Sequence, residues 1–155
     1  MPEAVIILGS ARDSGIADEM KEVLEKLGVE FSVRVASAHK TPEKALGIIR
    51  EASERECVFI TVAGRSNALS GFTAANTVRP VIAAPPVSSK FGGMDILSSL
   101  SMPSGVCPMT VIGAEQAALA AAKILALGNP SIREKIEAYM GSMRREAEES
   151  DNRVS

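Results

Sequence analysis

Short apolar runs alternate along the chain with segments in which apolar residues recur every three or four positions. A short, continuously apolar run predicts a strand buried on both faces, and the wider spacing predicts a helix with one face in the core. Strands are predicted at residues 4–8, 31–36, 58–63, 81–84 and 109–112. Helices are predicted at residues 13–27, 41–52, 67–77, 94–101, 114–127 and 130–145.

The alternation of strands and helices, with short connections, predicts parallel strands joined by right-handed crossovers. We therefore predict a single domain over residues 1–155, a three-layer α/β sandwich with a parallel, flavodoxin-like sheet and an extra C-terminal helix. Thr41 is predicted to cap the second helix, because Pro42 and Glu43 suit its first turn. The charged residues 144–155 are predicted to fray.

Composition excludes several partners. Hydrophobic residues make up 46% of the chain and charged residues 23%, which is typical of a globular domain. The formal net charge is −2, aromatic residues make up 3%, and tryptophan does not occur. Neither a cationic surface nor a stacking platform for nucleic acid is predicted.

The apolar stretch at residues 117–127 is interrupted by Lys123 and is too short to span a bilayer, so no membrane contact is predicted. The N-terminus has no signal-peptide pattern. Cys57 and Cys107 lie far apart, and His39 is the only histidine, so we expect two buried thiols and no metal site. This cysteine usage favours the reducing cytoplasm.

The helix predicted at residues 114–127 is rich in alanine and apolar on most faces. A helix that is apolar all round is normally buried on all sides. In a domain of this size a contact between subunits would supply that burial, so the pattern predicts a homo-oligomer.

Three loops with unusual sequences follow predicted strands, at the edge where open parallel sheets bind ligands. The first, at residues 9–13, combines Gly9, the hydroxyl of Ser10 and a helix N-terminus that favours an anion. It matches neither the dinucleotide nor the triphosphate glycine motif. The alternative is that Ser10 or Asp13 only caps the helix.

The second loop, at residues 37–40, carries His39 between the hydroxyl of Ser37 and the cation of Lys40. A lone histidine is often structural, but an imidazole at this position is suited to proton transfer near neutral pH. A nucleophilic triad would also have to use it.

The third loop, at residues 63–71, combines Gly64, Arg65 and Ser66, which suit a carboxylate or phosphate unless the arginine is simply solvated. A long segment at residues 85–108 is a candidate cover for the site, with Ser88, Ser89 and Lys90 as further candidates there.

Together the loops resemble those of the phosphoribosylaminoimidazole carboxylase family of purine biosynthesis. The resemblance extends from residue 5 to about residue 145 and rests on four motifs. These are Gly9-Ser10 with Asp13, Ser37-Ala38-His39, the glycine loop at residues 64–71, and Met102-Pro103-x-Gly105.

The family has two branches. A mutase moves a carboxylate from N5 to C4 of an aminoimidazole ribonucleotide, and a direct carboxylase (class II) joins free carbon dioxide to 5-aminoimidazole ribonucleotide. The mutase branch carries Ser-Ala-His-Arg and Ala-Ala-His-Leu-Pro-Gly, whereas this chain has Lys40 at that arginine and Ala68 at the second histidine. Both departures resemble the direct carboxylase, which is our leading hypothesis. N5-carboxyaminoimidazole ribonucleotide mutase is the alternative.

The resemblance makes residues 1–155 a catalytic domain with a small ribonucleotide and carbon dioxide as partners, no metal or other cofactor, and assembly as a homo-tetramer or homo-octamer. It implies that His39 moves the proton at C4. It implies that the ribose phosphate is bound by Ser10, Asp13, Ser37 and Lys40. It implies that the substrate or incoming carboxyl group contacts Gly64, Arg65 and Ser66.

Two functions from other classes fit less well. A receiver module needs an acidic phosphoacceptor after the third strand, where this chain has Ala63 and Gly64. A flavin- or nucleotide-binding module of the flavodoxin type needs a hydroxyl-rich loop after the first strand and aromatic residues around the flavin.

Overall fold

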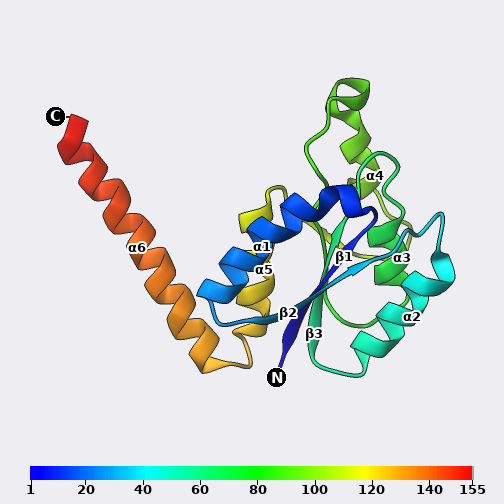
Figure 1. Ribbon diagram of the computed structural model, residues 1–155, viewed down its shortest axis with the longest axis horizontal. Helices are drawn as coiled ribbons and strands as arrows, with labels where there is room; N and C mark the ends of the chain where they lie inside the picture. Colours follow the sequence, from blue (N-terminus) through cyan, green and yellow to red (C-terminus); the bar gives the residue numbers. More distant parts are fainter. Residues whose placement is uncertain (155) are drawn as a thin grey trace.

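The computed structural model describes the backbone of residues 1–154 and the side chains of residues 1–151. Five strands form one parallel sheet in the order β2-β1-β3-β4-β5 (Figure 1). The strands are β1 (Glu3–Leu8), β2 (Glu30–Val35), β3 (Cys57–Val62), β4 (Val81–Ala83) and β5 (Met109–Thr110). Each lies where the sequence predicts a strand, although β4 and β5 are shorter than predicted.

Helices cover both faces of this sheet, which confirms the predicted three-layer sandwich. Helices α1 (Ser14–Lys26) and α5 (Ala114–Leu125) pack on one face, and α2 (Pro42–Ser53) and α3 (Leu69–Ala75) pack on the other (Figure 1). The remaining elements are the 3-10 helices η1 (Ala11–Asp13) and η2 (Lys90–Ile96), the short helix α4 (Leu97–Leu100), and the C-terminal helix α6 (Pro130–Val154).

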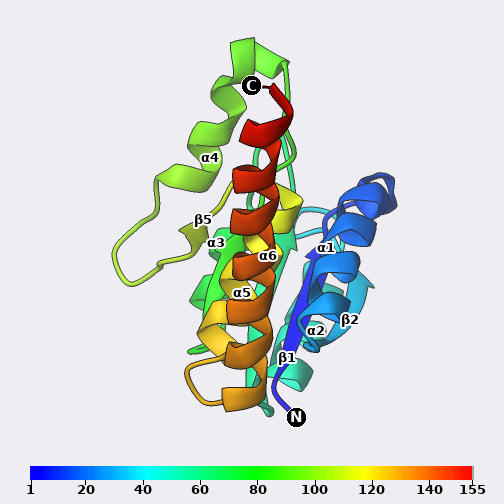
Figure 2. The same ribbon diagram turned by 90° about the vertical axis from the view of Figure 1, so that its left-hand side faces the viewer.

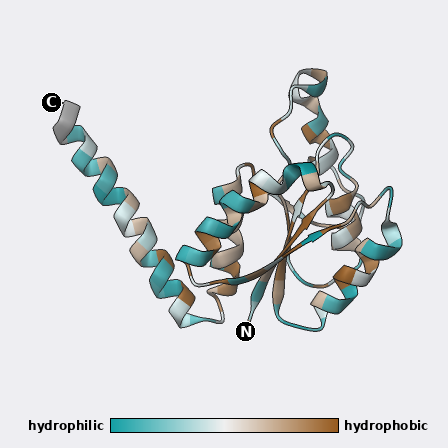
Figure 3. Ribbon diagram, in the orientation of Figure 1, coloured by the Kyte–Doolittle hydropathy of each residue, from teal (hydrophilic) through white to brown (hydrophobic). Residues whose placement is uncertain are grey.

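Strand β1 contributes to the core on both faces of the sheet. Successive side chains of a strand point to opposite faces. Ala4, Ile6 and Leu8 therefore join the core beneath α1 and α5. Val5 and Ile7 join the core beneath α2. All five are at most 2% exposed, so the apolar run is buried on both faces as predicted, and hydrophobic colour follows the central strands in Figure 3.

The alanine-rich helix α5 is buried within its own chain. Ala117, Ala118, Ala121 and Ala122 are fully buried in the core that α5 shares with α1 and the sheet. These alanines are therefore covered without a neighbouring subunit, whereas Leu119, Ala120 and Ile124 of the same helix are only partly buried. The alanines face inward, where their small side chains allow close packing against α1.

Helix α6 is longer than the sequence predicts. Its first turns bury Ile132 and Ile136, and Tyr139 Oη donates a hydrogen bond of 2.6 Å to Glu115 Oε1 of α5. The rest of the helix extends away from the sheet in Figure 1, and it is seen in front of α5 in Figure 2. Residues 144–154 are helical where fraying was predicted, since they are mostly strong helix formers without glycine or proline. Ser155 lies outside the described residues.

Two further predictions about the local structure are corrected. Helix α3 begins at Leu69 rather than at residue 67, because Asn67 Oδ1 accepts the backbone N–H of Ser70 at 3.2 Å, as the side chain of a residue just before a helix does. Cys57 is buried as predicted, but Cys107 is exposed, because it lies in the irregular segment before β5.

No helix within residues 1–154 is both long enough and apolar enough to cross a membrane.

Candidate active site

The loops that follow four of the strands line one cavity of about 630 Å³ at the carboxyl edge of the sheet. We name them the β1 loop (residues 9–13), the β2 loop (residues 36–41), the β3 loop (residues 63–68) and the β4 segment (residues 84–108). The cavity opens where the strand order reverses between β1 and β3, which is where open parallel sheets bind ligands. All the site residues predicted from the sequence line it: Ser10, Asp13, Ser37, His39, Lys40, Gly64, Arg65 and Ser66.

The β1 loop passes close to the β3 loop. A Cβ atom at Gly9 would lie 3.3 Å from Cβ of Ala63, so a larger residue would push the two loops apart. Ser10 Oγ accepts the backbone N–H of Arg12 at 3.3 Å and so caps η1, which confirms the structural role considered for it. Asp13 occupies the N-cap position of α1 but makes no capping bond with its side chain. Its carboxylate therefore remains available to the cavity.

The β2 loop is a turn held by its own hydrogen bonds. The hydroxyl of Thr41 accepts the N–H of Ser37 at 2.9 Å and lies 3.3 Å from the Ser37 carbonyl oxygen. Thr41 was predicted to cap α2, but its side chain makes no capping bond, because the hydroxyl turns back to the loop. Ser37 Oγ accepts the N–H of Lys40 at 3.1 Å, which leaves its own proton for a ligand. His39 lies exposed between them at the tip of the turn.

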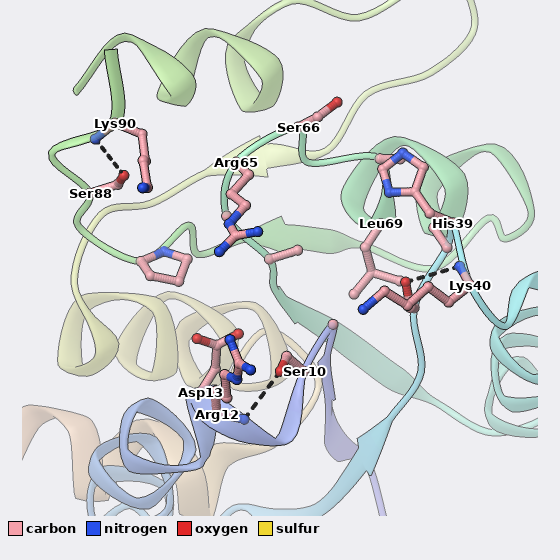
Figure 4. Close-up of a pocket in the computed structure, with 17 residues that line it drawn as sticks. Ser10, Arg12, Asp13, His39, Lys40, Arg65, Ser66, Leu69, Ser88 and Lys90 are labelled. Atoms are coloured by element: carbon pink, nitrogen blue, oxygen red, sulfur yellow. Dashed lines mark hydrogen bonds between the residues drawn. The ribbon is translucent and has the colours of Figure 1, made fainter. Parts of the chain in front are cut away.

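The β3 loop places Arg65 in a backbone conformation that only glycine adopts freely. Its φ angle is 59°, in the left-handed region. This conformation costs a non-glycine residue about 1–2 kcal/mol, so contacts elsewhere must hold it. The Arg65 guanidinium points toward the β1 loop in Figure 4, whereas the Ser66 hydroxyl is directed away from Ser10 and Asp13.

The cavity also contains residues that were not predicted as primary candidates. Arg12 lies in the first loop, and its charge was an available signal. Ser88 and Lys90, which were considered only as further candidates, line the cavity from the β4 segment, whereas Ser89 does not. Leu69 also lines it. A buried leucine at the start of a helix carries no sequence signal for a site.

The cavity is positively charged although the whole chain is not. Its lining includes four cationic side chains, Arg12, Lys40, Arg65 and Lys90, and a single carboxylate, Asp13. Within residues 1–151, none of the ion pairs involves these cations, so their charge is available to an anion. Desolvation by burial raises the pKa of the Asp13 carboxyl above its ordinary value. These charges favour a ligand with more than one negative charge.

Neither cysteine lines the cavity. Burial raises the pKa of the Cys57 thiol to about 11, which leaves it protonated and unreactive at neutral pH. Among the described residues, no three or more histidine, cysteine, aspartate or glutamate side chains gather in a group able to hold a metal ion.

Comparison with known proteins identifies relatives over almost the whole chain. The family model described as AIR carboxylase matches residues 3–146. A phosphoribosylaminoimidazole carboxylase of Archaeoglobus fulgidus is 53% identical over 152 residues, covering 98% of this chain and 84% of that protein. An N5-carboxyaminoimidazole ribonucleotide mutase of Methanocaldococcus jannaschii is 42% identical over 153 residues, covering 96% and 95%. The crystal structure of Treponema denticola PurE superimposes with a TM-score of 0.96 at 39% identity, covering 100% and 99% of the two chains.

We expect Asp13→Asn to raise the thermal unfolding midpoint of the ligand-free protein at neutral pH. Desolvation disfavours the charged carboxylate, so Asp13 lowers stability once the pH rises through its raised pKa. Well below the ordinary aspartate pKa of about 3.9, both side chains are neutral in the folded and unfolded states and the midpoints should converge. Calorimetry across this pH range measures the difference, with Glu22→Gln on the exposed face of α1 as the control. A lower midpoint for Asp13→Asn at neutral pH contradicts this explanation.

Proposed function

The chain belongs to the AIR carboxylase family, and we propose that it reversibly joins carbon dioxide to C4 of 5-aminoimidazole ribonucleotide. The product is 4-carboxy-5-aminoimidazole ribonucleotide of purine biosynthesis. The observation that carries this proposal is one cationic cavity that brings His39 together with anion-binding groups from the β1 and β3 loops. A phosphorylated ribonucleotide supplies the matching negative charge, and the imidazole suits a proton transfer on its base.

In this proposal the ribose phosphate binds between the β1 and β2 loops. Lys40 provides the positive charge, and Ser10 and Ser37 provide hydroxyl groups. The Ser37 hydroxyl is suited to donate its proton, because its bond with the Lys40 N–H uses only a lone pair of the oxygen. Asp13 is suited to accept hydrogen bonds from the ribose hydroxyls. Binding the nucleotide at this distance from the reacting carbon contributes orientation at C4.

The carboxyl group meets the β3 loop in the same proposal. The guanidinium of Arg65 offers paired donors that fit a carboxylate, and its charge opposes the negative charge that develops on carbon dioxide. Gly64 and Ser66 lie on either side of it and contribute backbone N–H groups. The incoming carbon dioxide is apolar, so the site that receives it should be small and partly dry.

The chemistry requires one proton acceptor. The electron-rich ring attacks carbon dioxide through C4, a C–C bond forms, and C4 becomes tetrahedral with both a hydrogen and a carboxylate. His39 as the neutral imidazole removes that hydrogen as a proton, and the electron pair of the C–H bond returns to the ring and restores its aromaticity. In the reverse direction the imidazolium protonates C4 and carbon dioxide leaves. Since the ring supplies the electrons, we propose that no metal or other cofactor takes part.

The mutase is the alternative function, and the relative from Methanocaldococcus jannaschii keeps it open. Lys40 and Ala68 both line the cavity, at the positions where the mutase pattern has arginine and histidine. These two substitutions leave one histidine in the site. They favour direct carboxylation over transfer of a carboxylate within the substrate.

We propose further that the enzyme works in the cytoplasm as a homo-tetramer or homo-octamer. The alanine face of α5 does not supply the contact, since it is buried in its own chain. Large apolar side chains of the β4 segment and β5 are the better candidates, because a monomer gains nothing from exposing several together. Their exposed fractions are 86% for Phe91, 62% for Met94, 55% for Leu97, 57% for Leu100 and 42% for Met109.

The source of the carboxyl carbon distinguishes the two reactions. With 5-aminoimidazole ribonucleotide and ¹³C-labelled carbon dioxide, we expect labelled product to form in the absence of ATP. With N5-carboxyaminoimidazole ribonucleotide in the same labelled buffer, a mutase would give unlabelled product at once, and that result would establish the alternative. Mass spectrometry of the product measures the label. Failure to convert either substrate would overturn the proposed function.

We expect His39→Asn to lower kcat by at least about 100-fold, because asparagine cannot accept the proton from C4. Binding of the ribonucleotide, measured by calorimetry, should be nearly unchanged, since the phosphate contacts stay in place. Near-normal turnover of this variant would remove His39 from the chemistry.

We expect the wild type to sediment as a tetramer or octamer and Leu100→Asp to shift it to smaller species, because a buried carboxylate would lose hydration at the contact. Val78→Asp serves as the control, since Val78 is 99% exposed at the other end of the sheet. Sedimentation velocity measures both. A monomeric wild type contradicts the proposed assembly.

A further inference from the structure

A buried cluster of polar side chains lies directly behind the β3 loop. Its centre is Asn67, which is 5% exposed, and Ser70 and Ser99 beside it are 0% and 2% exposed. Asn67 Nδ2 donates to Ser99 Oγ at 2.8 Å and to Ser70 Oγ at 3.0 Å, and Asn67 Oδ1 accepts the N–H of Ser70 at 3.2 Å. The amide is therefore satisfied on both its donor and its acceptor side.

The cluster connects two segments that are distant in the sequence. Ser70 lies in the first turn of α3, whereas Ser99 belongs to α4. Thr110 Oγ1 of β5 donates to the carbonyl oxygen of Ser99 at 2.8 Å and fixes α4 to the edge of the sheet. The β4 segment, which carries Lys90 into the cavity, is thereby tied to the β3 loop.

A second contact reaches the backbone of Arg65 itself. Ser98 Oγ accepts the N–H of Asn67 at 2.9 Å and lies 3.0 Å from the carbonyl oxygen of Arg65 and 2.8 Å from that of Asp95. The hydroxyl has one proton, which it can give to either carbonyl. Ser98 thus bridges the residues on both sides of Ser66, next to the left-handed turn at Arg65.

We propose that Asn67 is a positioning residue, which with Ser98 and Ser99 holds Arg65 in its left-handed conformation so that the guanidinium enters the cavity. This inference rests on the proposed role of Arg65 toward the carboxyl group. Arg65 is exposed, so its own side-chain packing does not impose the unfavourable φ angle. Ser98 Oγ contacts the Arg65 carbonyl oxygen and the Asn67 N–H, so it restrains the backbone that directly follows that angle. The Asn67 side chain anchors the same stretch to Ser70 and Ser99.

Packing alone does not explain this arrangement. An apolar side chain could fill the space behind the loop without the desolvation that a buried amide must offset. A buried amide instead specifies one geometry, because its donors and acceptors must each meet a partner. Here those partners are the two segments that carry Arg65 and Lys90.

The test is a double-mutant cycle on kcat/KM with Asn67→Ala and Arg65→Ala. If Asn67 acts through Arg65, Asn67→Ala should lower kcat/KM about tenfold, and the double variant should be no worse than Arg65→Ala alone. If the two substitutions acted independently, their fold-losses in kcat/KM would instead multiply in the double variant. The control is Asn76→Ala at the opposite end of α3, where the amide donates only to the Phe72 carbonyl oxygen at 2.8 Å and is exposed. This variant should keep wild-type activity.

The same cycle is measured on the binding of 4-carboxy-5-aminoimidazole ribonucleotide. Multiplying losses in the double variant, or wild-type activity of a folded Asn67→Ala protein, would overturn the positioning role while leaving the proposed function in place. A wild-type protein that binds this compound but does not turn over would overturn the function, and the binding cycle would still decide the role of Asn67. If Asn67→Ala does not fold, Ser98→Ala replaces it in the cycle.

Discussion

The parallel pairing of β1 with β3 is the contact on which the site depends. Six residues of each strand pair in register, from Glu3 with Cys57 to Leu8 with Val62. Because their last residues are level, the chain leaves both strands at the same edge, and Gly9 lets the two loops approach within contact of Ala63. The connections then depart to opposite faces of the sheet. A crevice therefore opens between the β1 and β3 loops, and the β2 loop and the β4 segment complete its lining.

Positive charge is concentrated at the cavity, although the chain as a whole is slightly negative. The chain has a formal net charge of −2, yet its cavity is lined by four cationic side chains and one carboxylate. A net charge averages over the surface, whereas a ligand responds to the charges within a few ångströms and to the low dielectric of the surrounding walls. A chain without a net basic charge is therefore compatible with a tight site for one small phosphorylated anion.

Several features of the site lower stability in the ligand-free protein. Arg65 adopts an unfavourable φ angle, Asp13 is a partly desolvated carboxylate, and the cations of the cavity form no ion pair within residues 1–151. A bound anion would relieve the repulsion among these cations. The buried amide of Asn67 and its serine partners hold the geometry before the ligand arrives, so the binding energy is not used to order the loop. Stability is supplied elsewhere, by the two apolar cores on either side of the sheet.

Local periodicity was enough to predict the sheet and its layers, because it records which side of each element is buried. Parallel connectivity brings the loops to one edge, so the convergence of Ser10, His39 and Arg65 was predictable as well. The sequence offered Lys90 and Ser89 alike as further candidates and did not decide that Lys90, and not Ser89, lines the cavity. That position depends on hydrogen bonds between residues some thirty positions apart, from Asn67 to Ser98 and Ser99. Nor did it predict that α5 is covered within its own chain. Periodicity reports that a face is buried, and only tertiary packing decides what covers it.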